Sequence, residues 1–174
     1  MPPLVCSFPP ISRRDARVLI LGTMPSPASL AARQFYGHRQ NAFWRIMGEL
    51  FDAGLDRPYA ERTRRLKARR VAVWDVLQQC EREGSLDSNI LRTSEVPNDF
   101  VAFFARHRQI RAIFFNGFKA ESSFMKLVLP IMEERLEGIP RERLPSTSPA
   151  NATFSFPAKL ASWTRVLEFL DDSV

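Results

Sequence analysis

The chain has 174 residues, of which 45% are hydrophobic, so it can bury a core without help from disulfides or metal, and we expect one domain over residues 1–174. An excess of 25 Lys and Arg over 19 Asp and Glu gives a net charge of +6, which favours a polyanionic partner. The two cysteines lack the spacing of a metal or disulfide framework, and no apolar run is long enough to span a bilayer, so we expect a cytoplasmic protein with no metal site.

The first half of the chain predicts one strand and one clear amphipathic helix. Residues 17–22 form a short apolar run that ends at Gly22 and is followed by Pro25, as expected of a buried strand that leads into a loop. The helical face further along comprises Phe43, Ile46, Met47, Leu50 and Phe51. Residues 61–70 are rich in charge, and this segment either faces phosphate or, as is more common for such runs, is a solvated helix face.

The second half continues the alternation of strand and helix. Apolar runs at 71–74 and 112–115 and a short segment around 143–144 predict strands. Helical stripes are expected over 100–104 and 120–131, and in a closing helix that contains Leu160, Trp163, Leu167 and Leu170. Strands that alternate with helices predict an α/β protein, with a parallel sheet of about four strands and helices on both faces.

In such sheets the ligand site lies beyond the carboxyl ends of the strands. The unusual sequences of this chain follow the predicted strands, at 23–27, Asp75, Asn116-Gly117 and 146–151. The last of these belongs to a loop of prolines and small polar residues, whose hydroxyl and backbone donors can approach a phosphate closely. We therefore predict a DNA-binding loop made of Pro145, Ser146, Thr147, Ser148, Pro149, Ala150 and Asn151; a plain proline-rich connection is the alternative.

Three motifs carry a family resemblance: Gly-Thr-Met-Pro at 22–25, Phe-Tyr-Gly-His at 35–38 running into Asn-Ala-Phe-Trp at 41–44, and Leu-Pro-Ser-Thr-Ser-Pro-Ala-Asn at 144–151. A weaker match to the same family lies at 73–76 and 84–88. Together they resemble the uracil-DNA glycosylase superfamily, most closely its hypoxanthine-DNA glycosylase branch. The resemblance implies a three-layer α/β/α sandwich and a monofunctional enzyme that needs no metal or cofactor and removes deaminated bases, chiefly hypoxanthine, from DNA.

The resemblance also implies a site. With its motifs, and with Asn116 at the end of a predicted strand, we place the base pocket at Gly22, Thr23, Met24, Pro25, Phe35, Tyr36 and Asn116. Many uracil-removing relatives carry Asp or Asn where Met24 stands and His where Leu144 stands, so another residue must orient the attacking water. In the hypoxanthine branch that role falls to the position of Asn41, although an Asn before a helical segment is also a favoured N-cap, and the two roles can coexist.

Physical reasoning assigns the remaining pocket residues. Phe35 and Tyr36 could bracket a flipped base, with core packing as the alternative. The amide of Asn116 offers one donor and one acceptor to the base edge, although Asn116-Gly117 could equally be a strand-to-helix turn. A carboxylate facing DNA is repelled unless it is hydrogen-bonded, so Asp75 ranks below these residues.

Within the loop, the hydroxyls of Ser146, Thr147 and Ser148 could donate to phosphate, and Ala150 and Asn151 could fill the gap left by an extruded nucleotide. We expect a monomer whose partner is DNA that contains a deaminated base. Two alternatives remain: a uracil or mismatch-specific uracil/thymine glycosylase, and a nucleic-acid-binding domain with weak catalysis. A serine hydrolase is disfavoured because neither Ser26 nor Ser146 lies in a Gly-x-Ser-x-Gly motif.

Overall fold

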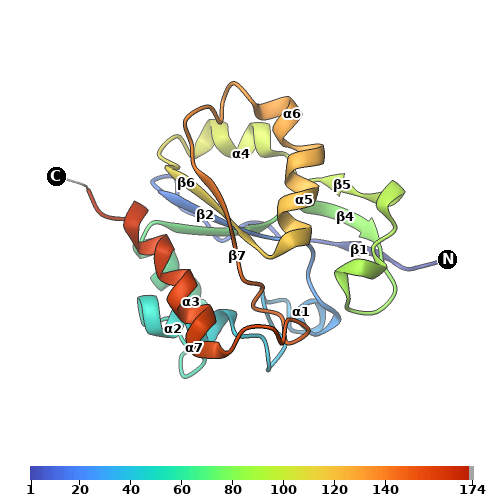
Figure 1. The fold of residues 1–174 in the computed structure, drawn as a ribbon, viewed down its shortest axis with the longest axis horizontal. Helices are drawn as coiled ribbons and strands as arrows, with labels where there is room; N and C mark the ends of the chain where they lie inside the picture. The colour runs from blue at the N-terminus through green and yellow to red at the C-terminus, as the bar shows by residue number, and fades with distance from the viewer. Residues whose placement is uncertain (173–174) are drawn as a thin grey trace.

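A four-stranded parallel sheet forms the centre of the protein in a computed structural model, which describes residues 1–172 (Figure 1). Its strands are β2 (Val18–Gly22), β3 (Val71–Asp75), β6 (Ala112–Asn116) and β7 (Arg141–Leu144), in the order β3-β2-β6-β7. All three pairings are parallel. β2 and β3 are buried along their whole length, which explains why they are continuous apolar runs rather than alternating ones. The predicted parallel sheet is confirmed.

Helices cover both faces of this sheet. They are α1 (Pro27–Ala32), α2 (Phe43–Phe51), α3 (Tyr59–Ala68), α4 (Phe100–Arg106), α5 (Phe118–Leu127), α6 (Leu129–Met132) and α7 (Phe156–Trp163). Figure 1 shows α4, α5 and α6 on one side of the sheet and α2, α3 and α7 on the other, which gives the three layers expected. No helix within residues 1–172 combines the length and the apolar character that crossing a membrane would require.

A second, antiparallel sheet was not predicted. It consists of β1 (Leu4–Cys6), β4 (Leu77–Glu81) and β5 (Val96–Pro97), in the order β1-β4-β5. Two short 3-10 helices, η1 (Asp87–Asn89) and η2 (Arg92–Ser94), lie between β4 and β5. The proline-rich start of the chain is thus a strand that pairs with the segment after β3, and this pairing carries Ser7 toward the end of the parallel sheet.

Two predicted helices end earlier than their apolar stripes suggest. The stripe over 120–131 is split between α5 and α6, because Pro130 has no N–H to continue the ladder. The closing stripe is α-helical only to Trp163 and continues as a 3-10 helix, η3 (Thr164–Phe169). At that change the Thr164 hydroxyl donates to the Ala161 carbonyl at 2.6 Å, and such local bonds compete with the regular helical ladder.

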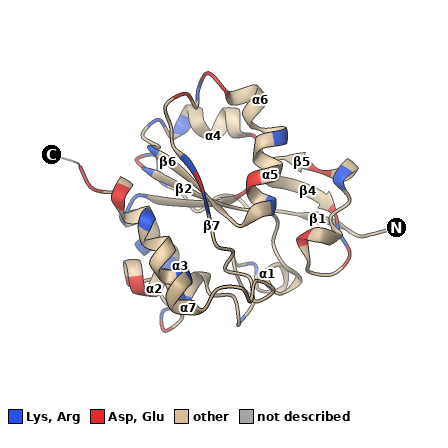
Figure 2. Ribbon diagram, viewed as in Figure 1, with Lys and Arg blue, Asp and Glu red and all other residues tan. Residues whose placement is uncertain are grey.

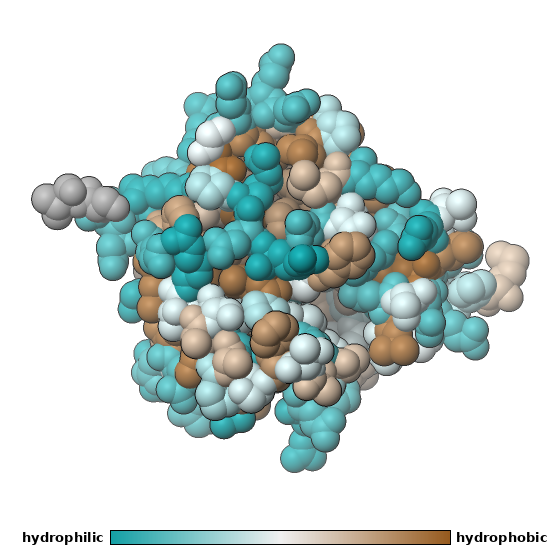
Figure 3. Space-filling model, viewed as in Figure 1, coloured by the Kyte–Doolittle hydropathy of each residue, from teal (hydrophilic) through white to brown (hydrophobic). Residues whose placement is uncertain are grey.

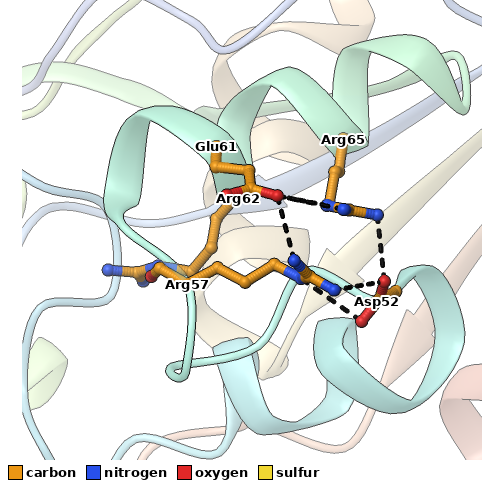
Figure 4. A network of polar contacts seen from close by, with 5 residues as sticks. All are labelled: Asp52, Arg57, Glu61, Arg62 and Arg65. Carbon is orange, nitrogen blue, oxygen red and sulfur yellow. Dashed lines mark hydrogen bonds and ion pairs between the residues drawn. The ribbon is translucent and has the colours of Figure 1, made fainter.

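The charged segment at 61–70 belongs mostly to α3 and makes internal ion pairs (Figure 4). Arg57 and Arg65 each pair with both Asp52 and Glu61, at 2.6–3.0 Å. Arg62 is buried, and its guanidinium carbon lies 4.7 Å from the centroid of the Trp44 ring. The segment therefore fastens α3 to the C-terminal end of α2, which favours the solvated-face interpretation over a phosphate-facing helix.

Candidate active site

The carboxyl ends of the parallel strands meet at a cleft of about 460 Å³. The register sets Gly22 beside Asp75 and Asn116 beside Leu144 at this edge of the sheet. All the predicted pocket residues line the cleft, as do Asn41 and every predicted loop residue except Pro145: Gly22, Thr23, Met24, Pro25, Phe35, Tyr36, Asn116, Ser146, Thr147, Ser148, Pro149, Ala150 and Asn151. The structure thus brings together segments that are distant in the sequence.

Gly22 lines the cleft at a point where no side chain fits. A Cβ atom at this position would be only 2.7 Å from Asp75 Oδ1 and 2.7 Å from the Tyr36 hydroxyl oxygen. Contacts this short do not occur in real proteins, so any larger residue would displace one of these side chains. The glycine therefore lets a carboxylate and a phenol approach the same strand end.

Asp75, which the sequence analysis ranked low, also lines the cleft. Its side chain is buried, and Ser7 Oγ donates a hydrogen bond to its Oδ2 at 3.0 Å. Burial, helped by the negative charge of Asp87, raises the pKa of Asp75 to about 7, while Ser7 and Arg82 act in the opposite direction. The cleft floor therefore carries a carboxyl group that changes charge near neutral pH.

Tyr36 forms one wall of the cleft. Its backbone φ is +54°, and its ring stacks on Phe43 with the ring centroids 4.0 Å apart. The hydroxyl is buried and has no hydrogen-bond partner among the described residues. Burial first, and then the Asp75 carboxylate, raise the pKa of Tyr36 above its usual value against the opposite effect of the Asn116 side chain, so the phenol stays protonated and remains a donor.

Phe35 belongs mainly to the core. Only 4% of its surface is exposed, its ring meets Phe8 edge-on at 5.4 Å, and its carbonyl accepts a hydrogen bond from Trp44 Nε1 at 2.7 Å. Phe35 still lines the cleft. Of the two aromatic residues predicted to bracket a base, Tyr36 therefore offers more surface, on the ring face that Phe43 does not cover.

Asn41 lies one residue before Ala42, which is the N-cap of α2, so the predicted N-cap position belongs to its neighbour. Oδ1 of Asn41 accepts a hydrogen bond from the Phe43 N–H at 2.9 Å, which supports the first turn of α2, and the same side chain lines the cleft. The next backbone N–H, that of Ala42, donates to the Thr147 carbonyl at 2.9 Å. A carbonyl oxygen has two lone pairs, so the bond to the Phe43 N–H leaves Asn41 able to accept one more hydrogen bond.

Asn116 and Thr147 exchange two hydrogen bonds. Asn116 Nδ2 donates to Thr147 Oγ1, and the Thr147 N–H donates to Asn116 Oδ1, both at 2.9 Å. Thr147 is 1% exposed, so its hydroxyl is directed at Asn116 rather than at solvent. The next residue, Gly117, has φ +93°, and a Cβ there would lie 3.0 Å from Ser146 Cβ, so the strand-to-helix turn also fits closely against the loop.

The remainder of the loop is fixed by short-range bonds. The hydroxyls of Ser146 and Ser148 accept from the backbone N–H groups of Ser148 and Ala150, both at 3.2 Å. The Pro145 carbonyl accepts from Trp163 Nε1 at 2.9 Å, and Pro145 itself lies outside the cleft lining. The two serine hydroxyls still have protons to donate.

Lys159 supports this loop from below. Its side chain is buried, and Nζ donates to the Asn151 carbonyl at 2.9 Å, while burial lowers its pKa. The loop above it carries no charged side chain, and Figure 2 shows this region as uncharged. In Figure 3 pale side chains of intermediate hydropathy gather in the lower part of the view, where Figure 1 places this loop. The loop therefore presents polar, uncharged groups over one buried cation.

Exposed cations lie beside the cleft rather than in it. Arg33 and Arg39 are exposed and join no ion pair within residues 1–172. Lys119, in contrast, pairs with Glu95. Across the described part of the chain, no group of three or more His, Cys, Asp or Glu side chains is placed to hold a metal ion.

Comparison with known proteins identifies the family. No family model matches the chain. A hypoxanthine DNA glycosylase of Methanosarcina acetivorans is 37% identical over 151 residues, which cover 85% of this chain and 89% of the relative. The chain belongs to the hypoxanthine DNA glycosylase family. A hypoxanthine DNA glycosylase of Methanosarcina barkeri is 33% identical over 65% of this chain and 71% of its own length.

A solved structure agrees with this membership. The solution NMR structure of a proposed uracil DNA glycosylase from M. acetivorans has a TM-score of 0.79 and 34% sequence identity, and the match covers 97% of this chain and 99% of that one. The predicted family and fold are confirmed. Within this hypoxanthine DNA glycosylase fold, Met24 and Leu144 are both buried, so neither supplies a polar group to the cleft.

Several side chains of the site were missed by sequence reasoning. Asp75 ends a buried strand, and that position alone could have raised its rank. Asp87 belongs to the weaker motif match at 84–88. It lines the cleft, and burial raises its pKa. Arg82 is 1% exposed and joins two loops, because it donates to the carbonyls of Pro25 at 2.6 Å and Gly84 at 3.0 Å. The sequence around Lys159 contains no pattern that indicates a place near the site.

Proposed function

We propose that the protein is a monofunctional glycosylase that hydrolyses the N-glycosidic bond of deaminated bases in DNA, chiefly that of deoxyinosine. The names of its relatives support this substrate. The cleft volume of about 460 Å³ is within the range of small-molecule sites, and a single extruded nucleoside would enter it from the loop side. We further propose that it acts as a cytoplasmic monomer in base excision repair.

The carboxamide of Asn41 in the lining of this cleft is the observation that carries the proposal. Its unused lone pair would accept a hydrogen bond from a water molecule and direct that water at the sugar carbon. An amide is too weakly basic to take the proton fully, so the proton is lost to solvent late in the reaction. Asn41 thus acts by positioning and by electrostatic stabilisation of the positive charge that grows on the sugar.

The loop at 145–151 would hold the DNA strand. Ser146 and Ser148 donate their hydroxyl protons to phosphate oxygens, and Ala150 and Asn151 occupy the gap that the extruded nucleotide leaves. Thr147 takes no part in phosphate contact, because it is 1% exposed. Asn116 keeps one amide hydrogen that Thr147 does not use, so it remains a candidate contact for the base.

The test is base release from labelled duplexes that contain inosine, uracil, xanthine or a thymine mismatch, with a chelator present and alkali added to cleave abasic sites. We expect inosine to be the best substrate. Fastest release from uracil or from mismatched thymine would favour the corresponding glycosylase instead. Binding without release from any duplex would contradict the proposed enzyme and leave a nucleic-acid-binding domain.

A further inference from the structure

Two oxygen atoms in the lining of the cleft have unused hydrogen-bonding capacity. The Tyr36 hydroxyl is buried without a partner within residues 1–172, and Asp75 Oδ1 lies nearby while Oδ2 is bonded to Ser7. Both Oδ1 and the hydroxyl oxygen are 2.7 Å from the point where a Gly22 Cβ would stand. A buried donor without a partner costs about 1–3 kcal/mol, so its place in a binding cleft points to a ligand acceptor.

The two atoms differ in kind. The phenol stays protonated, so it offers a donor, whereas Asp75 offers only acceptors once it is ionised, above about pH 7. A neighbouring donor and acceptor complement a lactam, in which a carbonyl oxygen stands next to an N–H. Hypoxanthine has this arrangement at O6 and N1–H.

The amide of Asn116 is less available for this purpose. Its Oδ1 and one hydrogen of Nδ2 are bonded to Thr147, so the acceptor and donor that a lactam requires are already partly used. A base contact by Asn116 alone would have to compete with the bonds that fix the loop. The donor and acceptor that remain available to a lactam are therefore the Tyr36 hydroxyl and Asp75 Oδ1.

We propose, on the basis of the proposed function, that Tyr36 and Asp75 recognise the lactam edge of the base. The Tyr36 hydroxyl donates a hydrogen bond to O6, and Oδ1 of Asp75 accepts one from N1–H. Adenine reverses this pattern, because its N1 is an acceptor and its exocyclic nitrogen is a donor. An ionised Asp75 repels the lone pair on N1, and the undamaged base is excluded.

The first experiment compares two substrates that differ only at this edge. Deoxyinosine carries O6 and N1–H, and 2′-deoxynebularine, whose base is unsubstituted purine, carries neither. Single-turnover base release from both is measured with the wild type and with Tyr36→Phe. We expect the variant to release hypoxanthine about tenfold more slowly and purine within about twofold of the wild-type rate, because only inosine loses a hydrogen bond.

Tyr59→Phe is the matched control. The Tyr59 hydroxyl accepts a hydrogen bond from the Phe35 N–H at 3.1 Å and does not line the cleft. The substitution removes a phenolic hydroxyl, as Tyr36→Phe does, but from a residue outside the cleft lining. The ratio of the inosine rate to the nebularine rate should therefore stay at the wild-type value. Any loss of folded protein lowers both rates equally and leaves each ratio unaffected.

Asp75→Asn tests the acceptor. Ser7 Oγ donates to one side-chain oxygen of residue 75, so an amide there keeps its oxygen toward Ser7 and turns its NH₂ group toward the base. The NH₂ group is a donor, so it cannot bond to the N1–H donor of hypoxanthine, but it can donate to the N1 acceptor of adenine. We expect inosine release to fall at least tenfold relative to nebularine release, and the preference for inosine over deoxyadenosine to narrow.

Equal losses on inosine and nebularine in both variants would overturn the assignment and reduce Tyr36 and Asp75 to packing roles. An unchanged preference for inosine over deoxyadenosine in Asp75→Asn would likewise overturn the role of Asp75. These results are distinct from failure of the proposed function, which would appear as no release of hypoxanthine by the wild type.

Discussion

Asn116 ends strand β6, and Thr147 lies in the loop after β7, yet each supplies the other with a donor and an acceptor at 2.9 Å. The pair joins the cleft wall to the loop that is proposed to contact DNA. Since Thr147 is almost fully buried, water cannot replace either bond. The conformation of the loop therefore depends on a residue in the sheet.

Asn116→Leu should leave the N–H and hydroxyl of Thr147 without partners. We expect the free energy of unfolding to fall by about 2–4 kcal/mol in urea titrations. The matched change Thr147→Val removes the hydroxyl and keeps the backbone bond to Oδ1, so it should cost only about 1 kcal/mol. Equal losses in the two variants would show that the backbone bond contributes nothing.

Asn41→Ser separates the support of α2 from catalysis, because a serine hydroxyl can still accept from the Phe43 N–H. We expect stability within about 0.5 kcal/mol of the wild type and base release slowed at least about a hundredfold. Asn41→Ala, which loses both functions, should in addition destabilise the protein by about 1 kcal/mol. Wild-type rates in the serine variant would eliminate Asn41 as the residue that orients water.

Stability should depend on the ionisation of Asp75. Its pKa is about 7 in the folded protein against 3.8 ordinarily, so between pH 4 and pH 7 the folded state binds more protons than the unfolded chain. The contribution of this residue to the free energy of unfolding therefore falls as pH rises through that window, by up to about 4 kcal/mol.

Asp75→Asn is the reference for this measurement, because it does not titrate and leaves the other groups around the site, Ser7, Tyr36, Arg82 and Asp87, in place. The difference between the two unfolding free energies, measured from pH 4 to pH 8, should change in favour of the variant up to about pH 7 and then level off. A difference that is constant over this range would refute the raised pKa.

Arg39 should contribute to DNA affinity through its charge. It is exposed close to His38 and Asn41, which line the cleft. Arg39→Ala should weaken binding to any duplex and reduce the slope of log affinity against log salt by about 1. Arg106→Ala makes the same change of charge at the end of α4, before the amino end of β6, and should leave the slope unaltered. Equal slopes for the two variants would place the DNA elsewhere.

The sequence predicted the parts of the structure that depend on local pattern. The apolar runs at 17–22 and 71–74 correctly predicted buried strands, whereas the N-cap of α2 is Ala42 rather than Asn41, which instead accepts from the Phe43 N–H. The pairing of β1 with β4 was not predictable, because it joins residues more than 70 positions apart and β4 shows no alternating burial. The environment of Asp75 was not predictable for the same reason, since it is built by Ser7 and Arg82 from other segments.

The absence of charged side chains from the loop above Lys159 divides the interaction with DNA into two parts. Contacts from hydroxyl and amide groups release few counterions, so their strength is nearly independent of ionic strength, whereas contacts from the exposed arginines weaken as salt is added. High salt should therefore remove random encounters with undamaged duplex first. The complex with an extruded nucleotide, which depends more on uncharged groups, would persist longer.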